Sequence, residues 1–245
     1  MFKLQTAFIL GAGLGTRLRP LTLDCPKPLL PVQGRPMICD AFDRCIDLGV
    51  ERIIVNTHHC ASRYEDFFAE KKWRGIPLFF RYEPVLLETA GGLKNVEDLI
   101  LGETLLIYNG DVLSSFELKP LVEMHRASGV EVTLALRTRE EPKQVGWDRK
   151  SARVRDIRSR LGIEGLEKTL FTGIYLVEKR FLNRLTPGKI ESVVEVFLRM
   201  LENKQDQNQI QGILVDEGSW MDLGTISDYE RVQEKGIPKL FTSIH

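Results

Sequence analysis

The sequence AFILGAGLGTRLRPLTLDCPKPLLPV, residues 7–32, joins an apolar run to three alternating glycines, two arginines and a lysine between prolines. The apolar start is typical of a buried strand, and the bare glycines let a ligand approach the backbone closely. Three interpretations compete for this stretch. They are a secretion signal, a dinucleotide-binding loop, and a loop that wraps a polyphosphate without a helix behind it.

The first two interpretations fail on particular residues. A signal peptide needs small residues before its cleavage site, but Arg17 and Arg19 follow the apolar run. A dinucleotide-binding loop needs a third glycine where Thr16 stands, and it opens directly into a helix. The prolines at positions 20, 26, 28 and 31 exclude such a helix before residue 36. A P-loop fails as well, because it would need a lysine in place of Thr16.

The remaining interpretation is a phosphate loop whose positive charge comes from side chains. Backbone N–H groups would surround the phosphates, and the planar guanidinium of Arg17 can hold two phosphate oxygens at once. Each such charge-assisted bond contributes on the order of 1.5–3 kcal/mol. Pro26 and Pro28 restrict the backbone on either side of Lys27. The alternative is a glycine turn with surface basic residues and a proline-rich loop.

Composition limits the class of protein. The chain has 245 residues, which fits one large domain or two small ones. Lys plus Arg and Asp plus Glu are both 34, which argues against a sequence-blind nucleic-acid binder. The four cysteines lack the close spacing of a zinc or redox motif, so we expect reduced thiols and a cytoplasmic location. No apolar run approaches the roughly 18 residues that a membrane span needs.

Apolar periodicity predicts strands and helices in alternation up to about residue 137. The predicted strands cover residues 4–10, 52–56, 77–82, 104–108 and 131–136, and the predicted helices cover 36–48, 61–72, 89–98 and 118–127. This alternation predicts an α/β, Rossmann-like fold with a mostly parallel sheet and helices on both faces. Ligands bind beyond the carboxyl ends of such strands, so the glycine loop and Asn109-Gly110-Asp111 are expected on one edge.

Beyond residue 137 the pattern changes to shorter strands separated by polar turns. Strands are expected over residues 145–147, 152–157, 169–177 and 210–215, and helices over 190–203 and 226–235. We interpret residues 1–245 as a single domain. Residues 138–190 would form a small lid or subdomain inserted within it.

The opening stretch resembles the signature of the sugar-1-phosphate nucleotidylyltransferases, also called NDP-sugar pyrophosphorylases. Their pattern is roughly G-x-G-T-R-L-x-P-x-T, then P-K-P-x-x-P, and it matches residues 13–22 and 26–31. Four later segments match in the same order: residues 87–92 (LETAGG), 109–111 (NGD), 171–175 (FTGIY) and 220–225 (WMDLGT). The resemblance covers residues 4–235 and implies a glycosyltransferase-A-like nucleotidyltransferase fold.

The resemblance implies a reaction in which an NTP and a sugar 1-phosphate give an NDP-sugar and pyrophosphate. The sugar phosphate attacks the α-phosphorus in line, so catalysis consists mostly of positioning and charge neutralisation. The resemblance assigns Asp111 and Asp222 as ligands of Mg²⁺, the implied cofactor. Arg17 would clamp the β and γ phosphates, and Lys27 would lie between nucleotide and sugar phosphate. Arg17, Lys27 and Asp111 are therefore the expected catalytic residues.

The resemblance also implies two substrate sites. The nucleotide-binding residues would be Leu10, Gly11, Ala12, Gly13, Gly15, Thr16, Arg17, Glu88, Gly91 and Gly92. The sugar-binding residues, on the side of the 138–190 lid, would be Asn109, Gly146, Thr172, Gly173 and Glu191. Glu88 either accepts a hydrogen bond from a ring N–H of uracil or guanine, or is a solvated carboxylate at a helix start.

One common family feature is absent. Many relatives carry Glu-Lys-Pro before the sugar strand, whereas residues 156–162 read DIRSRLG, which leaves Arg158 and Lys168 as candidates for the missing lysine. The chain resembles short forms, without a left-handed β-helix domain, that make GDP-mannose, GDP-heptose or UDP-MurNAc for the cell envelope, and a homodimer is common among them. The expected partners are an NTP and a sugar 1-phosphate, without nucleic acid or membrane. The competing functions are a cytidylyltransferase acting on another phosphorylated acceptor and a non-catalytic nucleotide-sugar sensor.

Overall fold

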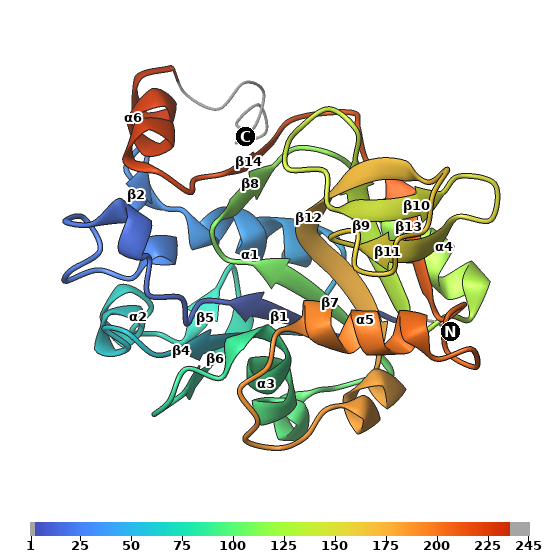
Figure 1. Ribbon diagram of the computed structural model, residues 1–245. Helices are drawn as coiled ribbons and strands as arrows, with labels where there is room; N and C mark the ends of the chain where they lie inside the picture. The colour runs from blue at the N-terminus through green and yellow to red at the C-terminus, as the bar shows by residue number, and fades with distance from the viewer. Residues whose placement is uncertain (1–2, 236–245) are drawn as a thin grey trace.

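The computed structural model describes residues 3–235, and a mixed ten-stranded sheet runs through this part of the chain (Figure 1). The strand order is β10-β11-β13-β9-β12-β7-β1-β4-β6-β5. Two further pairs, β14-β8 and β2-β3, form small separate sheets. The expected α/β class is confirmed.

The strands are β1 (Thr6–Leu10), β2 (Pro31–Val32), β3 (Arg35–Pro36), β4 (Arg52–Thr57), β5 (Lys72–Trp73), β6 (Ile76–Tyr82), β7 (Thr104–Asn109), β8 (Val112–Ser114), β9 (Val132–Arg137), β10 (Val145–Asp148), β11 (Arg153–Ile157), β12 (Glu167–Glu178), β13 (Ile210–Leu214) and β14 (Trp220–Asp222). The α-helices are α1 (Ile38–Asp47), α2 (Ser62–Phe67), α3 (Glu88–Asn95), α4 (Lys119–Ser128), α5 (Val193–Glu202) and α6 (Ile226–Lys235). Short 3₁₀ helices cover η1 (Thr16–Leu18), η2 (Lys27–Leu29), η3 (Glu97–Leu99) and η4 (Lys179–Arg184).

The sheet has a parallel half and a mixed half, in which β13 is parallel to β9 but the other pairings are antiparallel. Strands β7, β1, β4 and β6 are parallel neighbours, as the alternating pattern predicts. Strand β12 enters the sheet between β7 and β9 and runs antiparallel to both. The sheet is therefore mixed, and its parallel part is the half that carries the glycine loop.

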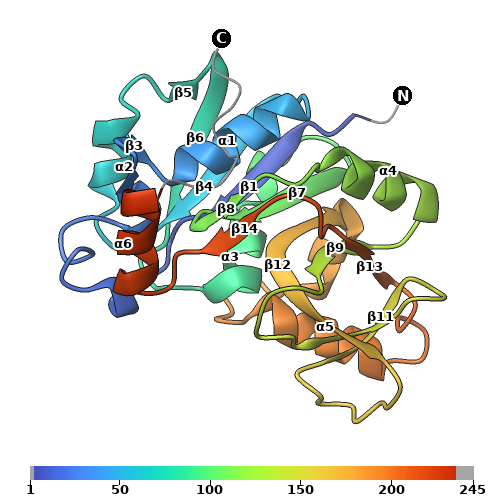
Figure 2. The same ribbon diagram turned by 90° about the horizontal axis from the view of Figure 1, so that it is seen from above.

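Helices cover both faces of the sheet, because the buried strands carry large apolar residues on both sides. In β1, Ala7 and Ile9 pack into the cluster that includes α1, α2 and α4. Phe8, which points to the other face, packs with residues of α3 and α5. Figure 2 shows α1 and α4 on one side of the strands and α3 and α5 on the other.

Two helix boundaries differ from the sequence-based expectations. The helix expected over residues 61–72 ends at Phe67, since the backbone turns at Phe68 and the chain forms the β5–β6 hairpin. The helix expected over residues 89–98 divides into α3 and the 3₁₀ helix η3. Apolar residues continue beyond each break, so periodicity alone gives no sign of either one.

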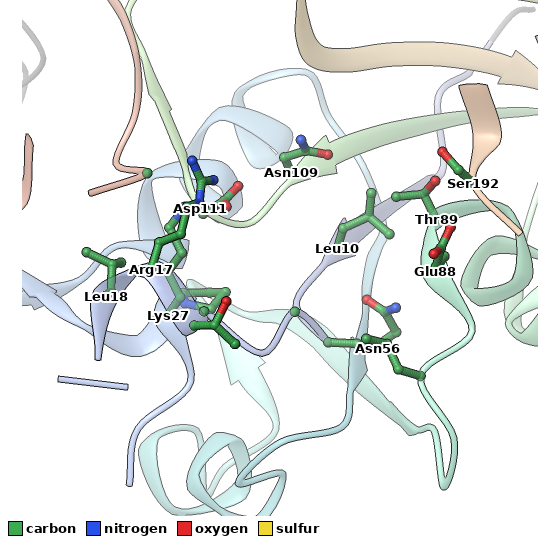
Figure 3. Close-up of a pocket in the computed structure, with 17 residues that line it drawn as sticks. Leu10, Arg17, Leu18, Lys27, Asn56, Glu88, Thr89, Asn109, Asp111 and Ser192 are labelled. Carbon is green, nitrogen blue, oxygen red and sulfur yellow. Dashed lines mark hydrogen bonds and ion pairs between the residues drawn. The ribbon is translucent and has the colours of Figure 1, made fainter. Parts of the chain in front are cut away.

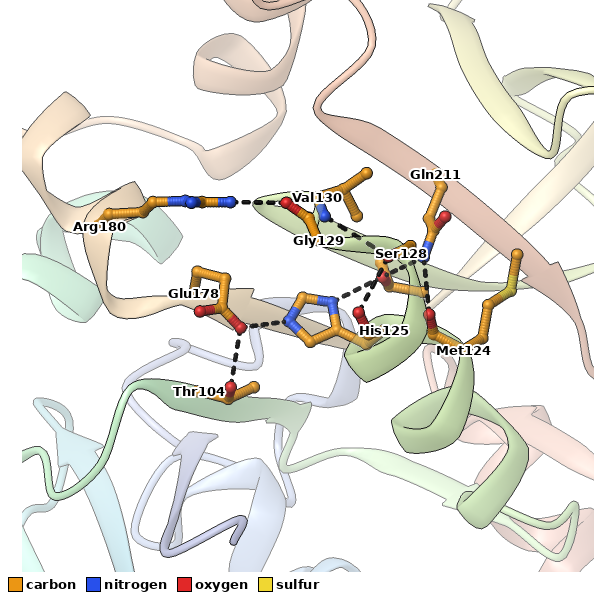
Figure 4. Close-up of polar contacts among 10 residues, drawn as sticks. Thr104, Met124, His125, Ser128, Gly129, Val130, Glu178, Arg180 and Gln211 are labelled. Atoms are coloured by element: carbon orange, nitrogen blue, oxygen red, sulfur yellow. Dashed lines mark hydrogen bonds and ion pairs between the residues drawn. The ribbon is translucent and has the colours of Figure 1, made fainter. Parts of the chain in front are cut away.

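A buried histidine joins α4 to the sheet (Figure 4). His125 Nδ1 lies 2.7 Å from Thr133 Oγ1 of β9, and its Nε2 lies 3.0 Å from Glu178 Oε1 of β12. The same carboxylate oxygen accepts a hydrogen bond from Thr104 of β7. Burial lowers the pKa of His125, although the neighbouring carboxylate opposes that shift. This polar cluster lies at the end of the sheet away from the glycine loop and has a structural role.

The C-terminal part of the described chain closes the edge near the glycine loop. Strand β14 pairs antiparallel with β8, so that Asp222 faces Val112, the residue after Asp111. Helix α6 follows and packs with β2 and β8 through a small apolar cluster that includes Val232, Val32 and Leu113. None of the helices within residues 3–235 has the length and apolar character that crossing a membrane requires.

Candidate active site

A cavity of about 390 Å³ lies at the carboxyl edge of the parallel strands (Figure 3). Leu10 of β1 is in register with Asn56 of β4 and with Asn109 of β7, and all three residues line the cavity. The remaining lining residues are Ala12, Gly13, Gly15, Thr16, Arg17, Leu18, Lys27, Pro28, Leu86, Glu88, Thr89, Asp111, Ser192 and Gly224. The glycine loop and Asn109 therefore lie on one edge of the sheet, as expected. The cavity at this edge is lined by residues from distant parts of the sequence.

The start of the glycine loop is fixed by hydrogen bonds. The N–H of Gly11 donates to Asn56 Oδ1 at 2.8 Å, and the hydroxyl of Tyr64 donates to the Gly11 carbonyl at 2.8 Å. A Cβ at Gly11 would lie 2.8 Å from the Asn56 carbonyl oxygen, so no side chain fits there. Burial raises the pKa of Tyr64, which keeps its hydroxyl as a donor. Gly11 itself faces protein and does not line the cavity.

The loop beyond Gly11 carries Arg17 to the cavity. Gly15 adopts a left-handed conformation (φ 61°) that begins the short helix η1, and Arg17 lies within this helix. The guanidinium of Arg17 lies against Gly224, where an added Cβ would be 3.0 Å from Nη1. Arg17 is exposed, so its donors are accessible to an anion in the cavity.

Lys27 bridges the two expected metal ligands. Its Nζ lies 2.6 Å from Asp111 Oδ2 and 3.0 Å from Asp222 Oδ1, and only 8% of its side chain is exposed. The β8–β14 pairing brings the two aspartates together from positions far apart in the sequence. Two carboxylates that converge on one cation, beside a cavity open to phosphate oxygens and water, fit a hard divalent ion. Within residues 3–235 no group of three or more His, Cys, Asp or Glu side chains could hold a metal by itself.

A buried polar chain supports this edge of the cavity and was not predicted from the sequence. Glu83 is fully buried and accepts hydrogen bonds from Asn56 Nδ2 at 2.8 Å and from the N–H of Leu87 at 3.0 Å. Asn56 in turn accepts from Gly11, so the glycine loop and the 83–88 loop share one network. One feature of the sequence could have indicated this role of Asn56, which is its position near the carboxyl end of a predicted parallel strand.

The segment around Glu88 meets the other end of the cavity. Glu88 is exposed, lines the cavity with Thr89 and has a left-handed backbone (φ 59°). A non-glycine residue in this region is uncommon and such outliers cluster at functional sites. In Figure 3, Glu88, Thr89 and Ser192 lie across the cavity from Arg17, Lys27 and Asp111.

Gly91 and Gly92 line neither this cavity nor the second cavity that adjoins it. A Cβ at Gly92 would lie 2.8 Å from both Asn56 Nδ2 and Glu83 Oε1, and a Cβ at Gly91 would overlap the carbonyl of Lys189. The structure therefore gives these glycines a packing role within α3. Their contact with a nucleoside stays a prediction.

A second cavity of about 280 Å³ adjoins the first and shares Leu10, Thr89, Asn109 and Ser192 with it. Thr172, Gly173 and Asp222 line this second cavity, as does Arg158. Gly173 is left-handed (φ 79°), and a Cβ there would overlap the side-chain amide of Asn109. The glycine thus allows Asn109 to lie between the two cavities.

Gly146 and Glu191, two of the expected sugar-binding residues, line neither cavity. A Cβ at Gly146 would lie 2.8 Å from Leu166 Cδ1 and 3.1 Å from Asp156 Cβ, so this glycine permits close packing under the lid. Glu191 is paired with Arg199 at 2.5 Å and with Lys189 at 2.6 Å. The hydrogen bond from Arg199 lowers the pKa of Glu191. Sugar contacts by these two residues stay predictions.

The model of the nucleotidyl transferase family matches residues 6–237. The chain belongs to the nucleotidyl transferase family. The protein is 34% identical over 233 residues to a mannose-1-phosphate guanylyltransferase of Mycobacterium tuberculosis, covering 92% of this chain and 62% of that protein. It is 31% identical over 252 residues to the mannose-1-phosphate guanylyltransferase catalytic subunit beta of Drosophila melanogaster, covering 96% and 66%. This nucleotidyl transferase therefore spans slightly less than two thirds of the length of each of these relatives.

Solved structures support the fold of this nucleotidyl transferase. A putative glucose-1-phosphate thymidylyltransferase from Bacillus anthracis matches with a TM-score of 0.78 and 21% identity, covering 94% of each chain. HddC from Yersinia pseudotuberculosis, complexed with GMP-PN, matches with a TM-score of 0.74 and 22% identity, covering 95% of this chain and 99% of that one. At this level of identity the likeness is one of fold.

Proposed function

We propose that this nucleotidyl transferase joins an NTP to a sugar 1-phosphate, giving an NDP-sugar and pyrophosphate. The observation that carries the proposal is the convergence of Lys27, Asp111 and Asp222 beside the glycine loop and Arg17. This arrangement suits the meeting of two anionic substrates, because it combines fixed cations with a pair of carboxylates. Family membership and the guanylyltransferase names of its relatives support the same activity.

The proposed mechanism uses positioning and charge neutralisation. The β and γ phosphates would lie against the backbone of residues 13–16 and the guanidinium of Arg17, and Lys27 would contact the phosphates at the reacting centre. A phosphate oxygen of the sugar 1-phosphate attacks the α-phosphorus, the bond from that phosphorus to the bridging oxygen breaks, and pyrophosphate leaves. Asp111 and Asp222 would hold Mg²⁺, which supplies charge neutralisation at the phosphates. No protein nucleophile is needed for this single displacement.

The base and the acceptor would lie at opposite sides of the shared edge. Glu88 is exposed at the end of the first cavity that lies across from Arg17, and its carboxylate suits the adjacent N–H donors of guanine. The relatives named guanylyltransferases favour the same base. In the second cavity, Arg158 is the better substitute for the absent lysine, because Lys168 bonds Ser159 and does not line this cavity. The products under this proposal are of the GDP-mannose, GDP-heptose or UDP-MurNAc type.

The wider organisation is part of the proposal. Residues 138–190 would act as the sugar-side lid, because Gln144, Val145 of β10 and Ile157 of β11 line the second cavity. All four cysteines are free thiols, which supports a cytoplasmic location. A homodimer remains an expectation from the resemblance.

A matrix assay of five NTPs against a panel of sugar 1-phosphates, read by pyrophosphate release, tests the proposal. Asp111→Asn and Asp222→Asn should each lower turnover by at least about 100-fold with the fold intact. Asp98→Asn is the matched control, since that aspartate pairs with Arg81 on the exposed surface. A sensor would bind nucleotide sugars without releasing pyrophosphate, and a cytidylyltransferase of another acceptor would respond only to CTP. Full activity in either active-site variant would refute the corresponding metal assignment.

A further inference from the structure

A small apolar cluster anchors the segments that carry the charged residues of the site. Its buried members are Leu18, Leu30, Val32, Met37, Leu113, Leu223 and Val232. Each of the four charged residues is followed within three positions by a leucine of this cluster. The pairs are Arg17 with Leu18, Lys27 with Leu30, Asp111 with Leu113, and Asp222 with Leu223. These leucines are at most 5% exposed, so their packing fixes the four short segments relative to one another.

The strand that carries Asp222 has little support of its own. Strand β14 forms three residue pairs with β8, and these two strands make a sheet separate from the ten-stranded one. A two-stranded ribbon by itself is marginally stable. Trp220 Nε1 donates to the carbonyl of Thr172 at 3.0 Å, which fixes the start of β14. Asp222 is the last residue of the strand, so its position depends on the chain that follows it.

Helix α6 follows Asp222 and fastens this part of the chain. Val232 of α6 is 1% exposed within the small apolar cluster. The hydroxyl of Tyr229 donates to the carbonyl of Pro31 at 2.6 Å, and the side-chain amide of Gln233 donates to the same carbonyl. Pro31 ends the motif that carries Lys27 and begins β2, which lies beside α6 in Figure 1. None of the described side chains of α6 lines either cavity, so any effect of this helix on the site is indirect.

We propose that α6 is a clasp that positions Asp222 against Lys27 and Asp111, with Val232 and Tyr229 as its positioning residues. The distance of 3.0 Å between Lys27 Nζ and Asp222 Oδ1 requires the end of β14 to stay at the cavity. When the clasp loosens, Asp222 leaves this position in part of the molecules, and the carboxylate pair is then incomplete. The inference rests on the proposed function, because it concerns how the geometry of that site is maintained.

The test measures the metal requirement of two variants of the full chain. Val232→Ala removes two buried methyl groups, and Tyr229→Phe removes only a hydroxyl group. We expect the Mg²⁺ concentration for half-maximal pyrophosphate release to rise at least about fivefold in Val232→Ala and about two- to threefold in Tyr229→Phe. High Mg²⁺ should restore most of the turnover, because an ion that binds the complete carboxylate pair favours the clasped state by mass action. KM for the sugar 1-phosphate should stay close to the wild-type value, since β10, β11, β12 and α5 supply much of the second cavity.

Mn²⁺ binding gives a second measurement that does not depend on turnover. Binding of Mn²⁺ in the presence of a non-hydrolysable GTP analogue, followed by electron paramagnetic resonance, should weaken by similar factors in the two variants. Val177→Ala is the matched control, because it removes the same two methyl groups from a fully buried valine of β12. Val177 is in register with Leu105 near the start of β7, at the end of the sheet away from the glycine loop. This control should unfold at a lower temperature with an unchanged metal requirement.

The outcomes separate the clasp from the proposed function. An unchanged Mg²⁺ requirement in Val232→Ala and Tyr229→Phe, or an equal rise in Val177→Ala, would overturn the inference and leave the proposed function standing. If Val232→Ala does not fold, the result for Tyr229→Phe decides, since that variant keeps the cluster filled. Absence of pyrophosphate release by the wild type with every NTP and sugar 1-phosphate would overturn both.

Discussion

Lys27→Met removes one ammonium group and keeps a side chain of similar shape. In the structure this ammonium lies 2.6 Å from Asp111 Oδ2 and 3.0 Å from Asp222 Oδ1. Without it, two carboxylates share one small region with no neutralising charge. The variant should therefore be less stable than the wild type, and a divalent cation should stabilise it more than it stabilises the wild type.

The magnitude follows from the exposure of the partners. A hydrogen bond to a charged group contributes about 1.5–3 kcal/mol. The Asp111 side chain is 30% exposed, whereas that of Asp222 is 41% exposed and is screened by water. Counting mainly the Asp111 bond gives a loss of about 2 kcal/mol. For a chain of this size, 1 kcal/mol corresponds to roughly 2–4 °C, so Tm should fall by about 4–8 °C.

Thermal unfolding with and without millimolar MgCl₂, in the absence of nucleotide, measures both effects. The ion replaces the missing charge in the variant and stabilises the native state by mass action, whereas in the wild type Lys27 already neutralises the pair. Turnover should fall by about 100-fold or more in the same variant. Lys94→Met is the control. The ammonium group of Lys94 lies 2.7 Å from a carboxylate oxygen of Glu97, and this pair lies away from the cavity. A Lys27→Met protein as stable as the wild type, with no added response to MgCl₂, would refute the reasoning.

Three other predictions concern the support of the site. Asn56→Ala leaves two buried groups without partners, the Gly11 N–H and a carboxylate oxygen of Glu83, so urea denaturation should show a loss on the order of 3 kcal/mol together with weaker nucleotide binding. An unchanged midpoint would mean that water replaces the amide. In Gly173→Ala, alanine would have to adopt a left-handed backbone and its Cβ would overlap the side chain of Asn109. We expect the variant to be destabilised by about 1–3 kcal/mol and to have a raised KM for the sugar 1-phosphate. A normal KM would show that Gly173 does not shape the acceptor site. Burial raises the pKa of Asp40 to about 6, above its unfolded value, so the native state binds this proton more tightly and stability should fall as pH rises from about 4 to 6. Asp40→Asn should remove that part of the fall in a pH series of unfolding curves, and an identical profile would contradict the assignment.

Local sequence patterns gave most of the secondary structure. The apolar run of β1 and the amphipathic face of α5 each place their large residues in the core, as their spacing predicts. The orientation of β12 was not predictable in the same way, because periodicity is the same for parallel and antiparallel strands. Similarly, the end of α2 at Phe67 depends on the β5–β6 hairpin, which only the folded chain supplies.

The sequence by itself determined the family, the course of the glycine- and proline-rich loop that we propose binds phosphate, and the identity of the charged residues near it. Glycine spacing, proline positions and the Arg17 and Lys27 motifs are properties of neighbouring residues, and they can be read without a fold. The tertiary structure decided which of those charges meet. It joined Lys27 to Asp111 and Asp222, turned Glu191 toward Arg199, and left the Tyr175 hydroxyl unpaired among the described residues. Such pairings link positions up to 195 residues apart, and packing geometry rather than local spacing sets their distances.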